Sequence, residues 1–445
     1  MPAVYKGNFG EREARRLICR AGFGPRPGQE KKLAAMGLRG AVHSLTRPTG
    51  KARLSGPTPV DQNGLAIAPA DAAGHDHLWW LDRMVRSDQQ LVERMALIFH
   101  DWFATLGPKV ANQRLMLDQS NLFRGNCFGS FLTLFTRVTV NPAMLITLDG
   151  QKNRRGRPNE NYAREMMELF SLGARRGYTE GDVRQMARAL TGWTNRYSDQ
   201  LGVYDFHFEP KLHDFGRKVV FGKAGKWGWR DAPRLCVQNP KHPSFFVKKL
   251  WSYFVSRPPK KATRQRLERI YRKSGWKIRP VVEAILLSPE FYEDDPMVKP
   301  PAVYLASMLR ARRRGIDTTA WVRLCERAGQ RLFNPPDVAG WDDSHWLDTA
   351  RMQARWEMTN AVIRPAVAAL ARPYPPTETT GVAVEKAIAS WNNPDLEQGE
   401  LDEMADFAER TAALANQPGE YSNFRRLRQA GLQQLVGVSS GMVMM

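Results

Sequence analysis

Residues 157–193 read RPNENYAREMMELFSLGARRGYTEGDVRQMARALTGW, and the ends and faces of two helices can be predicted from this stretch. Asn159 is placed to cap the first helix and Gly173 to end it, because asparagine accepts backbone N–H groups and glycine suits the left-handed C-terminal position. At about 100° per residue, the apolar and polar residues fall on opposite arcs of this helix. The polar arc holds Glu160, Asn161, Arg164, Glu165 and Glu168.

The second helix follows closely. Thr179 is its expected N-cap, and Asp182 three residues later completes an acidic variant of the capping box. Apolar residues then recur at helical spacing until Gly192 stops the helix. The polar arc of the first helix is therefore expected to lie beside a second helix with a basic outer face.

The letters PNENYAREMMELFSLG, followed by YTEGDV and ARALTGW, resemble the signature of the DUF1800 family, a large bacterial family with no assigned function. Similar pieces are RAGFGP from Arg20, HDFGRK from His213 and RLFNPPDVAGW from Arg331, so the resemblance covers roughly residues 9–360. Relatives typically show His-Asn-His-Phe-Ala-Thr where this chain has His100, Asp101 and Trp102 before Phe-Ala-Thr. The resemblance implies ancestry and no particular reaction.

Helical periodicity continues through most of the chain, so we predict a mainly α fold with one small β-hairpin. A multi-helix globular domain is expected over residues 9–372, with a loop or linker at 48–74 and the hairpin at 203–222. Residues 373–445, with ten acidic and five basic side chains, are expected to form an acidic helical appendage.

The composition excludes several classes of protein. The chain has 445 residues and no apolar run long enough for a transmembrane helix. Its first residues lack the apolar stretch of a signal peptide, so we expect a cytoplasmic protein. Four cysteines about a hundred residues apart favour reduced, mostly buried thiols over a disulfide framework or a zinc site.

The polar arc supports two interpretations. Glu160, Arg164 and Glu168, at spacings of four, are typical of a solvated ion-pair ladder. Alternatively, Glu165 and Glu168 share one ligand, or divide into general acid and general base if burial raises one pKa.

Two histidine segments are further candidates for catalysis. His213 and Asp214 lie in a predicted loop, where histidine serves as general base or metal ligand, although an aspartate before glycine also closes an Asx turn. His100 ends a predicted helix and is either a packed residue or a functional one. We expect the acidic helix, His100 and the His213 loop to converge on one cleft, with Lys218 as a further binding residue. Imidazole and carboxylate ligands together suit a divalent metal, but no metal-binding motif supports one.

The net charge of +21 indicates anionic partners. Residues 242–279 hold twelve Lys or Arg, among them Lys260, Lys261 and Arg264, against one glutamate, and aromatic residues lie between them. Such interleaving binds single-stranded nucleic acid when the rings are exposed, whereas at helical spacing the rings more often form core. Two function classes therefore remain: a hydrolase of a glycan or polyanionic substrate, and a non-catalytic protein that binds nucleic acid or an anionic polymer through 242–279.

Overall fold

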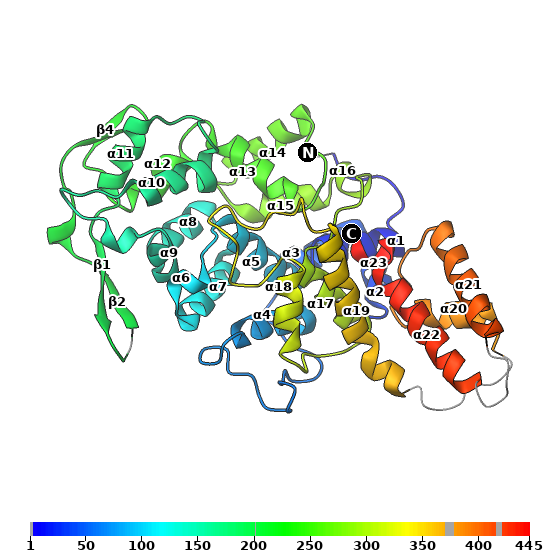
Figure 1. The fold of residues 1–445 in the computed structure, drawn as a ribbon. Helices are drawn as coiled ribbons and strands as arrows, with labels where there is room; N and C mark the ends of the chain where they lie inside the picture. Colours follow the sequence, from blue (N-terminus) through cyan, green and yellow to red (C-terminus); the bar gives the residue numbers. More distant parts are fainter. Residues whose placement is uncertain (1–2, 201, 370–377, 415–420) are drawn as a thin grey trace.

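The computed structural model describes residues 3–200, 202–369, 378–414 and 421–445, and it is mainly α-helical, as predicted (Figure 1). The first helices are α1 (Glu11–Arg20), α2 (Gln29–Ala35), α3 (Gly37–Thr46), α4 (His75–Arg86), α5 (Gln90–Trp102), α6 (Gly107–Val110), α7 (Gln113–Asn126), α8 (Phe131–Thr139) and α9 (Pro142–Thr147). Helix α1 forms because Ala14, Leu17 and Ile18 recur on one face, and that face is fully buried. Between α3 and α4, residues 48–74 carry isolated bridges and no helix, which agrees with the predicted loop.

The middle of the chain carries the two motif helices and all the named strands of the described residues. Its elements are η1 (Gly150–Lys152), α10 (Glu160–Met167), the π-helix η2 (Glu168–Leu172), α11 (Glu180–Ala189), β1 (Trp193–Ser198), β2 (Gly202–Phe208), η3 (Pro210–Leu212), β3 (Lys218–Val220), β4 (Lys223–Gly225), α12 (Asp231–Val237) and α13 (His242–Ser252).

The predicted hairpin range of 203–222 needs correction, because two antiparallel hairpins form. Strand β2 pairs back with β1, and β3 pairs onward with β4, so the segment between β2 and β3 joins two hairpins. Strand β1 was missed because its side chains are only half-buried or exposed, and it lacks the alternation of a strand with one buried face. The β1–β2 hairpin extends from one end of the molecule (Figure 1).

The remaining helices are α14 (Lys261–Lys273), α15 (Ile278–Leu286), α16 (Pro289–Tyr292), α17 (Pro301–Ala311), α18 (Ala320–Arg327), α19 (Thr349–Ala369), α20 (Thr380–Ala389), α21 (Gln398–Ala413), α22 (Tyr421–Val438) and α23 (Ser440–Val443). Helices α20, α21 and α22 form the end of the molecule opposite the β1–β2 hairpin (Figure 1). The predicted division between 372 and 373, with its prolines, lies outside the described residues.

The C-terminal helices are joined to the rest of the fold by buried bonds. The hydroxyl of Tyr304 in α17 donates to the Gly437 carbonyl at 2.7 Å, and the Lys299 N–H donates to the Val443 carbonyl at 2.9 Å. Buried apolar side chains from α1 to α23 form one continuous core. The helices after residue 378 therefore share the hydrophobic core of the earlier helices.

The four cysteines are free and buried, in agreement with the prediction of reduced thiols. They lie in different parts of the core: Cys19 in α1, Cys127 after α7, Cys236 in α12 and Cys325 in α18. Within the described ranges, each helix is too short or too polar to cross a membrane.

Candidate functional site

Helix α10 has the caps and faces that the sequence predicts. The Asn159 side chain accepts the Asn161 N–H at 3.0 Å, and Thr179 and Asp182 form the reciprocal capping box of α11. Tyr162, Met166 and Phe170 are buried, whereas Glu160, Asn161, Arg164, Glu165 and Glu168 are half-buried or exposed. The polar arc therefore faces outward, as expected.

The predicted ion-pair ladder along α10 does not form as such. Arg164 pairs weakly with Glu160, at 3.3 Å, and strongly with Glu180 at the start of α11, at 2.7 and 2.8 Å. These bonds, led by that to Glu180, raise the pKa of Arg164. Glu168 instead accepts a hydrogen bond from the Tyr178 hydroxyl at 2.9 Å. The ladder fails because the next helix supplies a better partner for Arg164 than Glu168 does.

Glu165 is left without a partner. Its carboxyl is half-buried and has no hydrogen bond or ion pair within the described part of the chain. Burial raises the pKa of Glu165, and the neighbouring charges of Glu168 and Asp337 raise it further against the opposing effect of Arg164. Asp337 belongs to the NPPDVAGW segment, so this second motif lies near the acidic helix.

After Met167 the helix continues as the π-helix η2, in which the Ser171 hydroxyl donates to the Met166 carbonyl at 2.6 Å. π-Helical turns are rare and occur frequently at functional sites. Gly173 ends the turn with φ 93 and ψ 156, so its φ is positive, as expected for glycine at a helix end, but its ψ lies outside the predicted left-handed helical region.

The carbonyls at the end of η2 are held by three side chains from elsewhere in the fold. Lys249 Nζ donates to Leu169 O at 3.2 Å, and Trp102 Nε1 donates to Phe170 O at 3.1 Å. His242 Nδ1 lies 2.9 Å from Ser171 O and donates to it. These donors satisfy carbonyls that a helix end otherwise exposes. Trp102, which stands where relatives typically have a second histidine, thus positions the acidic helix.

Asp101 joins three segments that are distant in the sequence. It accepts hydrogen bonds from the Tyr253 hydroxyl at 2.6 Å and from the Trp341 N–H at 2.8 Å. Gly340 is needed there, because a Cβ on it would lie 2.3 Å from Asp101 Oδ1. Burial raises the pKa of Asp101 and lowers that of Lys249 to about 8, although Asp101 partly counteracts the shift of Lys249.

A cavity of about 90 Å³ lies beside Asp101, Tyr253 and Trp341. Arg94 lines the cavity and is only 3% exposed. Its Nε has no hydrogen-bond partner among the described residues. The indole N–H of Trp341 is also buried and has no hydrogen-bond partner among the described residues. The cavity lining therefore combines hydrogen-bond donors with the carboxylate of Asp101 and the hydroxyl of Tyr253.

His100 does not face this cavity. It is 1% exposed, and its ring is packed against Trp80, Phe333 and Trp341 at centroid distances of 5.4, 5.6 and 5.5 Å. Burial lowers the pKa of His100 to about 3, so it is neutral at physiological pH. Its contacts are those of a packed histidine.

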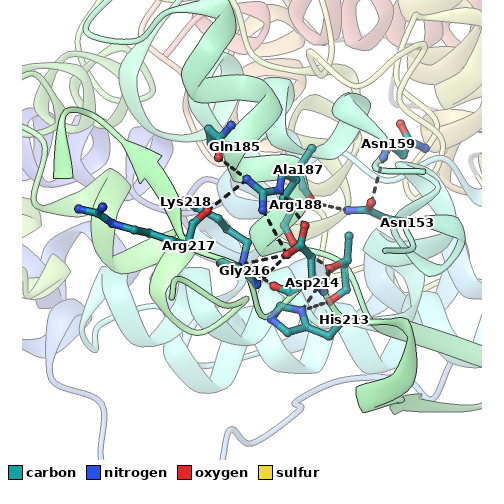
Figure 2. Close-up of polar contacts among 11 residues, drawn as sticks. Asn153, Asn159, Gln185, Ala187, Arg188, His213, Asp214, Gly216, Arg217 and Lys218 are labelled. Carbon is teal, nitrogen blue, oxygen red and sulfur yellow. Dashed lines mark hydrogen bonds and ion pairs between the residues drawn. The ribbon is translucent and has the colours of Figure 1, made fainter. Parts of the chain in front are cut away.

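The loop from His213 to Lys218 folds back on the end of α11 (Figure 2). Arg188 donates to both carboxylate oxygens of Asp214, at 2.7 and 3.2 Å, and Lys218 Nζ donates to the carbonyls of Asp214 and Gly216. The Gly216 N–H donates to Asp214 Oδ1 at 2.8 Å and closes the Asx turn. Lys218 is 1% exposed, so its ammonium group is used inside the loop.

His213 has one ring nitrogen engaged and one free. Nδ1 lies 2.8 Å from the Thr191 carbonyl, and because a carbonyl only accepts, the proton is on Nδ1. Nε2 then carries a lone pair and has no hydrogen-bond partner in the described ranges. Burial lowers the pKa of His213 despite the opposing bond to Thr191, so the ring favours its neutral form.

A family model described as "Protein of unknown function (DUF1800)" matches residues 16–438. The chain belongs to the DUF1800 family. No curated protein and no solved structure matches this DUF1800 protein. The family match extends past the roughly 9–360 indicated by the motifs and includes most of the C-terminal helices.

The candidate residues of this DUF1800 protein fall into two groups at opposite ends of α11. Arg164 contacts Glu180 at the start of α11, whereas Asp214 contacts Arg188 eight residues later, about 12 Å along the axis. Asn153, which bonds both the Asn159 N–H and the Ala187 carbonyl, shows that α10 starts near the end of α11 (Figure 2). Glu165 and Glu168 lie beyond Arg164, no hydrogen bond or ion pair of the described residues joins them to His213, and the single cleft expected for these residues stays a prediction.

The basic segment of this DUF1800 protein has its aromatic residues buried or half-buried against the core. Phe246, Trp251 and Tyr271 are at most 1% exposed, so they are core and present no stacking surface. Lys260 and Lys261 are exposed, and Arg264 is half-buried and pairs with Glu268 at 3.4 Å. No three His, Cys, Asp or Glu side chains of the described residues form a group that could hold a metal ion.

The sequence did not indicate that Lys249, Tyr253 and Asp337 lie around the acidic helix and Asp101. Asp337 lies in the quoted NPPDVAGW motif, and Asp101 marked a departure from relatives, so both carried a signal. Lys249 and Tyr253 carried none, because they occur in a segment where lysines and aromatic residues are common.

Proposed function

We propose that this DUF1800 protein is a hydrolase of a glycan or another polyanionic substrate, with Glu165 as general acid and Glu168 as general base. The observation that carries the proposal is the half-buried Glu165 carboxyl, which has no partner in the described chain and lies beside a second carboxylate. A carboxyl kept without a partner has lost hydration and gained no protein bond, and such groups cluster at active sites.

The two carboxyls have different surroundings, as acid and base roles require. Burial and the charge of Glu168 favour the protonated form of Glu165, whereas Glu168 accepts the Tyr178 hydroxyl at 2.9 Å. In the reaction, Glu165 gives its proton to the leaving oxygen as the bond to the substrate carbon breaks. Glu168 takes a proton from the water that forms the new bond, and both residues then re-equilibrate with solvent.

Two arginines beside Glu168 favour an acidic substrate. Arg175 is exposed, its N–H donates to the Tyr178 hydroxyl at 3.3 Å, and Arg176 follows it. Neither guanidinium has an ion pair in the described part of the chain. They supply positive charge next to the catalytic carboxyls, where a carboxylate or sulfate on a polymer would bind.

The test is release of reducing ends from a panel of acidic and neutral polysaccharides. We expect Glu165→Gln and Glu168→Gln to lower the rate by about 100-fold or more, since each removes one proton-transfer group. Glu160→Gln is the matched control on the same helix and retains the wild-type rate. The proposal fails if the wild type releases nothing from any acidic polymer, or if all three variants behave alike.

A second candidate function is binding of nucleic acid or an anionic polymer by residues 242–279. It is favoured by the exposed cations Lys260, Lys261 and Lys273, which have no ion pair in the described chain. Because the aromatic residues of this segment are buried or half-buried against the core, such binding would be mainly electrostatic and would depend little on base stacking.

Salt elution from heparin tests this second function. Lys260→Glu combined with Lys261→Glu should elute at clearly lower salt than the wild type, and the double reversal Lys223→Glu, Lys226→Glu at β4 is the control of equal charge. If both double variants elute at equally lowered salt, the net charge of the protein, and not residues 260 and 261, causes the binding to heparin.

A further inference from the structure

A positively charged cavity lies far from the acidic helix in sequence. It has a volume of about 530 Å³ and is formed by the start of α2, the C-terminal ends of α4 and α17, and the loop at 55–57. Six cationic residues and one acidic residue line it. The cavity is large enough for a ligand of nucleotide size.

The buried Arg310 and the half-buried Arg26 form the frame of this cavity. Arg310 is 1% exposed and donates to Gly24 O at 2.8 Å, Val85 O at 2.6 Å and Gln29 Oε1 at 3.0 Å. Arg26 donates to Ser55 O and Val85 O, each at 2.9 Å. Both arginines hold carbonyls and an amide, and neither has a carboxylate partner. Their positive charges therefore remain uncompensated inside the wall.

The cavity also presents cations with unused hydrogen-bonding capacity. Arg86 Nε is buried without a partner in the described chain, and Arg86 Nη1 reaches the Asp82 carboxylate only at 3.4 and 3.5 Å. Arg313, at φ 53, and Lys32 are exposed and have no ion pair within the described ranges.

The acidic groups nearby leave this charge uncompensated. Asp88, the acidic residue of the lining, accepts the Arg53 backbone N–H at 2.9 Å and pairs with the Arg53 side chain at 3.0 Å. Arg314, the sixth cation, is paired with Asp317 at 2.7 Å. Burial and the charge of Arg86 lower the pKa of Arg26, and burial and the charge of Arg26 lower that of Arg310. Mutual repulsion of this kind is relieved when an anion binds.

We propose that this cavity binds a phosphorylated small molecule, with Arg86 and Arg313 contacting the phosphate groups. Guanidinium groups match phosphate geometry and form charge-assisted hydrogen bonds in pairs. Lys32 contributes charge at the rim, and Arg26 and Arg310 add the fixed positive field. Pro27, Pro57 and Leu309 provide apolar wall for the uncharged part of the ligand. The proposal is independent of the hydrolase function, because none of its residues belongs to that site.

Calorimetric titration and thermal melting at low salt test the site, with inorganic pyrophosphate, ATP and AMP as probes. Pyrophosphate or ATP should raise the melting temperature of the wild type, because binding to the folded state alone stabilises it. Arg313→Gln should weaken binding about tenfold or more, since a charge-assisted contact is lost. Arg184→Gln on the exposed face of α11 removes the same charge outside both proposed binding surfaces and should bind as the wild type does.

Arg86→Lys is a second variant, which tests the site even if Arg313→Gln does not fold. It keeps the charge beside Asp82 but loses the planar fork, so binding should weaken while the fold remains. The proposal is overturned if none of the probes shifts the wild-type melting temperature at about 5 mM. It is also overturned if Arg184→Gln weakens binding as much as Arg313→Gln, since general surface charge would then be the cause.

Discussion

The acidic helix and the His213 loop are both family motifs rich in charged residues, yet their charges are used in opposite ways. In the loop, Asp214 bonds Arg188 through both carboxylate oxygens, and the Lys218 ammonium is enclosed by carbonyls. On the helix, the half-buried Glu165 carboxyl has no partner in the described chain. The first arrangement stabilises the fold, whereas the second leaves a polar group available for chemistry.

Likeness to a family motif therefore does not separate scaffold from active site. The two motifs differ instead in pairing, since both oxygens of the Asp214 carboxylate are bonded, whereas the Glu165 carboxyl has no partner among the described residues. Variants of the two motifs test this contrast.

Asp214→Ala should cost the most stability. It leaves Arg188 and the buried Lys218 without their carboxylate, and loss of one partner from a largely buried charged network costs about 2–3 kcal/mol. Urea unfolding measures the change. Asp205→Ala, in the exposed pair with Arg196, is the control and should be close to wild type. Equal stability of the two variants would remove the structural role assigned to the loop.

The same carboxylate should make stability depend on pH. The bonds to Arg188 lower the pKa of Asp214 to about 2 in the folded chain, below the value of about 3.9 expected when unfolded. Its contribution is therefore complete above pH 4 and is lost as the pH falls toward 2. The difference in unfolding free energy between wild type and Asp214→Asn should shrink over this range. A difference that stays constant with pH would contradict the assigned pKa.

Asp101→Asn tests the polar groups behind the acidic helix. The amide oxygen still accepts the Trp341 N–H, and the amide NH2 donates to the Tyr253 hydroxyl, which reverses its role, so the fold should persist, but the negative charge that raises the Lys249 pKa is removed. The pKa of Lys249 should therefore fall below its value of about 8. NMR titration of methylated lysines measures it, and Asp343→Asn on the exposed loop is the control. An unchanged Lys249 titration would show that the two residues are not coupled.

Glu165→Gln should have the smallest effect on stability. The folded-state pKa of Glu165 is raised, so the folded chain binds this proton more tightly, and ionisation at neutral pH opposes folding. Removing the charge should change stability by less than about 1 kcal/mol and in the stabilising direction, the usual exchange between stability and function. Glu160→Gln, which loses the Arg164 contact, is the comparison. Clear destabilisation by Glu165→Gln would make this residue structural, like Asp214.

The local features of the site were predictable from the sequence. The Asn159 cap, the Thr179–Asp182 capping box and the outward polar arc depend on neighbours within one turn, and all three are present. The preference of Arg164 for Glu180 was not predictable, because it depends on how two helices pack.

Long-range features were beyond sequence reasoning for the same reason. The π turn at Glu168–Leu172 is held by Lys249, Trp102 and His242 from other helices, so its cause lies far along the chain. Asp101 and Trp341 meet across 240 residues. His100 has the sequence surroundings of a helix end, and only the packed fold shows that aromatic rings enclose it.

The reactivity of the four buried thiols can report where the chain opens locally. Burial raises the pKa of Cys127 and of Cys236 to about 12, so these thiols react with alkylating reagents only when their surroundings open. Because Cys19, Cys127, Cys236 and Cys325 lie in separate elements, the order in which they are alkylated under mild denaturant would give the order in which those regions unfold. A cysteine introduced at the surface would likewise label alone, giving a single attachment point for a fluorophore or a spin label.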